Sequence, residues 1–173
     1  MAIVKVLFSY PCTPTPLGEL IEAVEGKGEP SHTGIILYGK IFEALANGFV
    51  KSPLNSYDAF KHTLVEVDVP NLSHARLEAK NLLYTPYGWW DCIISGIKSL
   101  FGLQLRGNGT RSVHCSEAVT RILRAGGLEI LPEVYADDIT SADLYKALQE
   151  VKTSEVTLYP NNDTDQASGG VAL

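Results

Sequence analysis

The sequence predicts an α+β protein in which an antiparallel sheet packs against helices. Segments rich in β-branched and alternating apolar residues fill the first part of the chain, and segments with helical apolar spacing follow them. This order, strands first and helices later, is typical of the α+β class. The length of 173 residues suits one core. We assign residues 1–160 to a single domain and residues 161–173 to a flexible polar tail.

The expected strands and helices follow from local patterns. The strands are Ala2–Ser9, Ser31–Tyr38, Lys40–Ala46 with a possible extension at Gly48–Lys51, and His62–Val69. Thr153–Leu158 is either a last edge strand or a disordered segment. The helices are Leu17–Val24, a short turn at Ser56–Phe60, Pro70–Leu83, the very apolar Trp89–Phe101, the segment after Cys115, and Thr140–Val151. Thr140 with Asp143 predicts a capped start of the last helix. Tyr38 and Gly39 predict the turn of a hairpin.

Composition excludes several functional classes. Hydrophobic residues make up 45% and charged residues 20% of the chain, and the net charge is −6, so nothing favours nucleic acid or anionic membranes. Three cysteines without paired spacing indicate a reducing compartment rather than a disulfide framework. Residues 1–10 resemble a strand and not a signal peptide, and no apolar run is long enough for a membrane span. We expect a cytoplasmic protein, with phage or virion association as an alternative.

Cys115 is the candidate nucleophile. The apolar residues Ala118, Val119, Ile122 and Leu123 repeat with helical spacing, and Gly126-Gly127 forms a natural C-cap. Cys115 therefore lies at the first turn of a helix, where free backbone N–H groups and the helix dipole favour a thiolate. Its own N–H could help to form an oxyanion hole. The alternative is a small buried hydrophobic residue, which free cysteines usually are.

His32 and Glu43 are the candidate base and its orienting carboxylate. If Tyr38-Gly39 are the two turn residues, Gly34 lies opposite Glu43, and His32 and Glu43 become diagonal neighbours on one face. Gly34 leaves room for that approach. A carboxylate on one imidazole nitrogen leaves the other nitrogen free to take the cysteine proton. With a turn at Gly39-Lys40 the pair would lie too far apart. Alternatively, both residues are merely solvated.

The other histidines and cysteines are weaker candidates. His114 adjoins Cys115 in sequence, so the two side chains should diverge, and we expect a supporting loop residue. His62 and His74 are expected at the surface or at a helix cap, Cys12 in a turn and Cys92 in the core. A zinc site built from Cys12, His32, His114 and Cys115 lacks the usual ligand spacing. We therefore expect no metal and no cofactor.

The motifs S-H-T-G-I-I-L, I-F-E-A and H-C-S-E-A-V, in this order, resemble the circularly permuted NlpC-type papain-fold proteins of the YiiX/YebB-like group. H-T-G-I-I also resembles the permuted PPPDE isopeptidases. The resemblance covers about Val4–Leu148, although the family's Gly-Asp opening strand is replaced by other residues. It implies a papain-like fold with the nucleophile helix late in the chain, and it matches Cys115 to the nucleophile, His32 to the base and Glu43 to the orienting residue.

The resemblance also implies an activity, that of a cysteine peptidase or amidase acting through an acyl-enzyme. The expected partners are a peptide, a peptidoglycan fragment or an acyl substrate. Tyr10 and Tyr87 are candidates for an oxyanion or substrate contact, beside a simple packing role.

Two other functions remain open from the sequence. One is a binding or host-interaction module on the same scaffold, in which Trp89-Trp90 would form a contact surface. The other is a lipid acyltransferase or thioesterase with Trp89–Phe101 lining an acyl groove. Both aromatic features could equally be core.

Overall fold

The computed structural model describes residues 2–10, 28–88, 112–151 and 154–158. Among these residues it places six strands, three α-helices and two 3-10 turns. The helices expected at Leu17–Val24 and Trp89–Phe101 lie outside the described residues, as do Cys12, Cys92 and the tail at 161–173.

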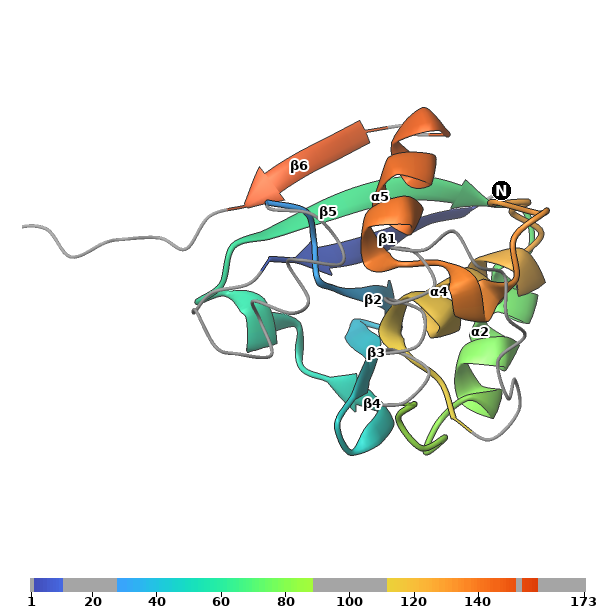
Figure 1. Ribbon diagram of the computed structural model, residues 1–173, viewed down its shortest axis with the longest axis horizontal. Coiled ribbons are helices and arrows are strands. Elements are labelled where there is room, and N and C mark those ends of the chain that lie inside the picture. Colours follow the sequence, from blue (N-terminus) through green and yellow to red (C-terminus); the bar gives the residue numbers. More distant parts are fainter. Residues whose placement is uncertain (1, 11–27, 89–111, 152–153, 159–173) are drawn as a thin grey trace, which may run out of the picture.

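A six-stranded antiparallel sheet forms the framework (Figure 1), in the order β4-β3-β2-β1-β5-β6. Its strands are β1 (Ala2–Ser9), β2 (His32–Leu37), β3 (Lys40–Leu45), β4 (Gly48–Ser52), β5 (His62–Val69) and β6 (Ser154–Leu158). The described helices are α2 (Leu72–Asn81), α4 (Cys115–Ala125) and α5 (Ser141–Glu150), with 3-10 turns at Leu54–Tyr57 and Ala136–Asp138. The α+β class and the antiparallel sheet are therefore confirmed.

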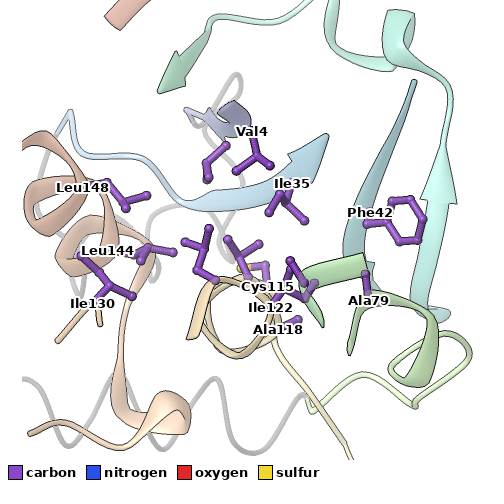
Figure 2. Packing of buried hydrophobic residues seen from close by; sticks show 14 of the residues in the cluster. Val4, Ile35, Phe42, Ala79, Cys115, Ala118, Ile122, Ile130, Leu144 and Leu148 are labelled. Atoms are coloured by element: carbon purple, nitrogen blue, oxygen red, sulfur yellow. The ribbon is translucent and has the colours of Figure 1, made fainter. Parts of the chain in front are cut away.

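The core lies between one face of the sheet and the helices. Figure 2 shows Cys115, Ala118 and Ile122 of α4 beneath Ile35 of β2, with α5 on one flank of α4. Alternation along each strand supplies the apolar side chains, because every second residue points to the same face. The sheet residues that join this cluster include Val4, Val6, Phe8, Ile35, Phe42, Val65 and Val67. The nucleophile candidate thus belongs to the central helix of the core.

Local signals fix where the helices begin and end. Thr140 accepts a hydrogen bond from the N–H of Asp143 and completes the expected capping box of α5. Gly126 ends α4, and a Cβ at this position would clash with Val69 of β5, so the glycine permits close packing. Gly127 follows with a φ of 85°, which a glycine adopts without strain.

Two expectations about the middle of the chain need correction. Gly48–Ser52 is a separate strand, β4, that pairs with β3 across a turn at Ala46-Asn47, and Gly48 begins it with a φ of 109°. A side chain there would lie 2.7 Å from the carbonyl oxygen of Thr85. The short turn expected at Ser56–Phe60 begins earlier, at Leu54, directly after Pro53. Pro53 is extended, so the turn starts at the first residue after it.

His62 is also placed differently from the expectation, because it is buried at 8% exposure and not at the surface. Its Nδ1 bonds the carbonyl oxygen of Phe60 at 2.9 Å. His74 lies exposed in the first turn of α2 and donates its backbone N–H to the capping Asn71, as expected of a cap residue. In the portion of the chain that the structure describes, no helix is both long and apolar enough to cross a membrane.

Candidate active site

Cys115 is the first residue of α4 and lies at the edge of the core, 6% exposed. The first N–H groups of a helix have no acceptor within the helix, so the backbone around the sulfur provides free donors. His114 forms the N-cap: its Nδ1 accepts the N–H of Glu117 at 3.3 Å, and the Glu117 carboxylate accepts the N–H of His114. This reciprocal pair fixes the start of the helix and therefore the position of the thiol.

The hairpin places His32 and Glu43 in contact. Gly34 pairs with Glu43 and Leu37 with Lys40, which leaves Tyr38-Gly39 as the turn and confirms the register expected for that turn. The Nε2 of His32 then lies 2.8 Å from Oε2 of Glu43. An added Cβ at Gly34 would lie 2.8 Å from Cγ2 of Ile41 and 3.3 Å from Cβ of Glu43. The absence of a side chain at this position therefore makes the diagonal contact feasible.

Glu43 is a buried carboxylate, 1% exposed, and hydrogen-bond donors converge on it. The hydroxyl of Tyr57 donates to the same Oε2 at 2.5 Å, and Ser52 is a further hydrogen-bond partner. Burial alone would raise the pKa of Glu43, but the hydrogen bonds from His32, Ser52 and Tyr57 and the charge of His32 lower it below its usual value. Glu43 is therefore held as an anion beside the imidazole.

Tyr57 was not identified from the sequence. Its ring stacks on His32 with the centroids 6.0 Å apart and an angle of 9° between the planes. Burial and the neighbouring Glu43 raise the pKa of the Tyr57 hydroxyl, so it stays protonated and remains a donor. The only sequence signal was that Tyr57 falls in a short turn. Nothing local connects it with a carboxylate two strands earlier in the chain.

The negative charge of a Cys115 thiolate and the positive charge of a His32 imidazolium stabilise each other. Burial would raise the pKa of the Cys115 thiol, but hydrogen bonding and positive charge from His114 and His32 hold it well below its usual range. Burial would lower the pKa of His32, yet the hydrogen bonds and negative charges of Cys115 and Glu43 raise it to about 10. Near neutral pH the favoured state is a thiolate beside an imidazolium. The His32 side chain keeps 18% exposure, so the imidazole is partly accessible to solvent.

The start of a second helix, α5, also lies close to the Cys115 sulfur. Ser141, the first residue of α5, is 1% exposed, and its Oγ lies 3.5 Å from Sγ of Cys115. Its hydroxyl can donate to a thiolate. Because Ser141 begins α5, the positive end of that helix dipole also lies near the sulfur. A capped helix start is expected here from the sequence, but the contact with Cys115 is not, because the two residues lie far apart along the chain.

His114 has a more direct role than the expected loop residue. It is buried at 3% exposure, and its Nε2 donates to the carbonyl oxygen of Asp137 at 3.0 Å. Its Nδ1 can accept the N–H of Glu117 only while the ring is neutral. Burial lowers the pKa of His114, but hydrogen bonding to Cys115 and the thiolate charge raise it to about 8. Protonation of His114 would therefore compete with its capping role.

The two tyrosine candidates lie at different places. The Tyr10 hydroxyl and Thr63 Oγ1 are 3.1 Å apart, and Lys61 lies over the Tyr10 ring. Tyr87 is half-buried against the core and forms an isolated bridge with Val113, two residues before Cys115. Both remain predictions as oxyanion or substrate contacts. Within the described ranges, no group of three His, Cys, Asp or Glu residues is arranged to hold a metal ion.

Compared with protein-family models and with curated proteins, the chain matches none. The function is therefore inferred from the geometry of the site. This geometry offers a nucleophile with a lowered pKa, an imidazole that can transfer protons, and a carboxylate that holds the imidazole in place.

Proposed function

We propose that this protein is a cysteine hydrolase of the permuted papain-like class, a peptidase or amidase that cleaves an amide bond through Cys115, His32 and Glu43. One observation carries the proposal: His32 bonds the buried Glu43 through Nε2, and its charge together with that of Cys115 favours a thiolate–imidazolium pair. Acyl transfer by thiols requires this combination.

The reaction follows from the positions of these groups. The Cys115 thiolate attacks the carbonyl carbon of the substrate, a C–S bond forms, and the carbonyl oxygen becomes an oxyanion. The free N–H groups at the start of α4 stabilise that oxyanion. His32 gives its proton to the leaving amine, and the C–N bond breaks to leave a thioester.

Release of the acyl group uses the same residues in reverse roles. The neutral His32 takes a proton from water, and the resulting hydroxide attacks the thioester carbon. The C–S bond breaks, and the carboxylic acid and the thiolate are regenerated. Nε2 of His32 is bonded to Glu43, so Nδ1 is the nitrogen that exchanges protons with sulfur, amine and water.

The acyl-enzyme is the species that tests the proposal most simply. We expect p-nitrophenyl acetate to give a burst of p-nitrophenol and an acetyl adduct on Cys115, detected by intact-mass and peptide-mass analysis. Cys115→Ser should abolish the adduct, and His32→Ala should slow both its formation and its hydrolysis. An adduct that forms equally in His32→Ala, or that lies on another residue, would contradict the proposed mechanism.

The choice of amide substrate is tested next, with the protein and its Cys115→Ser variant. Short peptides and muropeptides are offered together with long-chain acyl esters. Cleavage of a peptide bond supports the amidase, whereas turnover of long-chain esters alone favours a thioesterase or acyltransferase.

A further inference from the structure

A cationic surface patch lies at the turn of the β2–β3 hairpin and includes an exposed aromatic ring. It consists of Tyr38, Lys40, Lys51, Arg76 and Lys80. Tyr38 is 52% exposed, and the guanidinium carbon of Arg76 and the Nζ of Lys80 lie 4.5 and 5.3 Å from its ring centroid. Lys51 lies 5.4 Å from the ring centroid of Phe42, whose own centroid is 6.4 Å from that of Tyr38. Strand and helix thus place these cations around the rings of Tyr38 and Phe42.

The backbone brings these cations to one side. Phe42 pairs with Lys51, and Lys40 precedes Phe42 by two residues, so all three point to the same face of the sheet. Arg76 and Lys80 are one turn apart on α2. Among the residues that the structure describes, none of the four cations forms an ion pair. The buried Nε of Arg76 also has no hydrogen-bond partner there. The patch therefore offers unsatisfied positive charge.

The backbone of Tyr38 points to a role other than folding. Tyr38 and Gly39 have φ values of 54° and 67°, which makes the turn type I′. The first turn position of this type prefers Asn, Asp or Gly, and a bulky ring there is strained. Strain of this kind, kept at an exposed aromatic residue, is a reason to look for a function.

We propose that this patch is a docking surface for an acidic segment of a partner protein. The guanidinium of Arg76, over the Tyr38 ring, can bind a carboxylate through its terminal N–H groups, and Lys40, Lys51 and Lys80 provide further charges. Tyr38 supplies the exposed aromatic contact that protein interfaces favour. The net charge of −6 opposes a long phosphate polymer, whereas a short acidic segment within about 8 Å interacts mainly with the patch itself.

The docking surface is separate from the candidate active site. His32 and Tyr38 lie at opposite ends of β2, about 20 Å apart at 3.3 Å per residue. Binding at the patch therefore does not require Cys115, and the proposal does not depend on the proposed hydrolase activity.

The test measures binding of a fluorescein-labelled peptide with the repeat Glu-Glu-Leu by fluorescence anisotropy. A matched peptide with Gln in place of Glu and a single-stranded oligothymidylate serve as comparisons. We expect the acidic peptide to bind at about 50 mM salt and to bind much more weakly at about 500 mM, because screening acts on exposed charges. Amide shifts in two-dimensional NMR spectra should map to the β2–β3 turn and α2.

Two variants and one matched control separate the patch from general charge. Arg76→Ala and Tyr38→Asn should each weaken peptide binding about tenfold, as central interface residues do. Asn suits the type I′ turn, so Tyr38→Asn should keep the melting temperature. Lys61→Ala, which removes a cation from the Tyr10 ring at the other end of the sheet, should leave binding nearly unchanged.

Three results would overturn the docking proposal. They are the absence of binding to the acidic peptide, equal losses in Lys61→Ala and Arg76→Ala, and tighter binding of oligothymidylate than of the peptide through the same residues. The last result would assign the patch to nucleic acid. Peptide binding that persists in Cys115→Ser supports the docking proposal whatever the outcome for hydrolysis.

Discussion

Glu43 has almost no contact with solvent, and its negative charge depends on the side chains that bond it. Two groups, Nε2 of His32 and the hydroxyl of Tyr57, contact the same oxygen at 2.8 and 2.5 Å. A buried carboxylate that loses a donor keeps its desolvation cost without the compensating bond. Tyr57 is therefore a positioning residue, because it acts on His32 through Glu43 and by stacking.

Tyr57→Phe tests that role at the level of a single hydroxyl group. The variant keeps the ring against His32 but removes the bond to Glu43, so the pKa of Glu43 should rise. A Glu43 that is less fully ionised stabilises the His32 imidazolium less. The apparent pKa of Cys115 should therefore rise, but by less than in His32→Ala. The alkylation rate of Cys115 against pH measures this shift.

Tyr38→Phe is the matched control for Tyr57→Phe, because it removes the hydroxyl of an exposed tyrosine at the far end of β2. It should leave the thiol titration unchanged. A Tyr57→Phe variant with the parent's thiol titration but a lower melting temperature would show that Tyr57 serves the fold alone.

The sequence could indicate Cys115, His32 and Glu43 as candidates because each has a local signal: a helix start, a strand end next to a glycine, and a hairpin register. Tyr57 and Ser141 have no such signal. Their roles arise only when a turn and a helix start from distant parts of the chain meet His32 and Cys115. Tertiary contacts of single polar groups leave no periodic pattern in a sequence.

At the level of elements, the start of α4 combines two roles in one residue. His114 caps the helix through Nδ1 and also lies beside the Cys115 thiolate, which raises the pKa of His114 to about 8. Stability of the helix and reactivity of the thiol are therefore coupled at this position, and substitutions can separate them.

His114→Asn and His114→Ala make that separation. Asn can still accept the N–H of Glu117, whereas Ala cannot, so Ala should be less stable by about 1 kcal/mol. Both variants lose the imidazole, so both should raise the apparent pKa of Cys115 by a similar amount. Thermal or urea unfolding measures the first effect and alkylation against pH the second. Equal stability of the two variants, or an unchanged thiol pKa in both, would contradict this account.

Elements with strong periodicity were predicted well. β1, β5 and the capped α5 match their sequence patterns closely, and the β2–β3 register follows from a turn with two positive φ values. The sequence predicts β4 only as an extension of the hairpin, because the close approach of Thr85 to Gly48 and Phe49 comes from far along the chain. His62 was expected at the surface because strand alternation alone does not show what covers each face.

For the whole molecule, the fold brings together a hairpin and a helix that are far apart in sequence. β2 and β3 supply His32 and Glu43, and α4 supplies Cys115 some seventy residues later. Packing of α4 against the sheet holds these parts in place, so the core positions the chemistry (Figure 2). Composition and pattern predicted the α+β class, whereas the finer papain-like assignment remains a proposal.

The pKa shifts define the pH range in which the whole site is ready to react. The Cys115 pKa is lowered, so the thiolate is lost only as pH falls through that low value. The His32 pKa is raised to about 10, so the proton needed by the leaving amine is lost only as pH rises through that value. The rate of hydrolysis should therefore be nearly constant across neutral pH, and it should fall only at clearly acidic and clearly alkaline pH.

The most direct test of the central claim is the rate of Cys115 alkylation by iodoacetamide as a function of pH, followed by mass analysis of the Cys115 peptide. The account predicts an apparent pKa well below the ordinary thiol value of about 8.5, and a rise towards that value in His32→Ala and, by less, in Glu43→Gln. An ordinary thiol titration that ignores both substitutions would contradict the thiolate–imidazolium pair and, with it, the hydrolase.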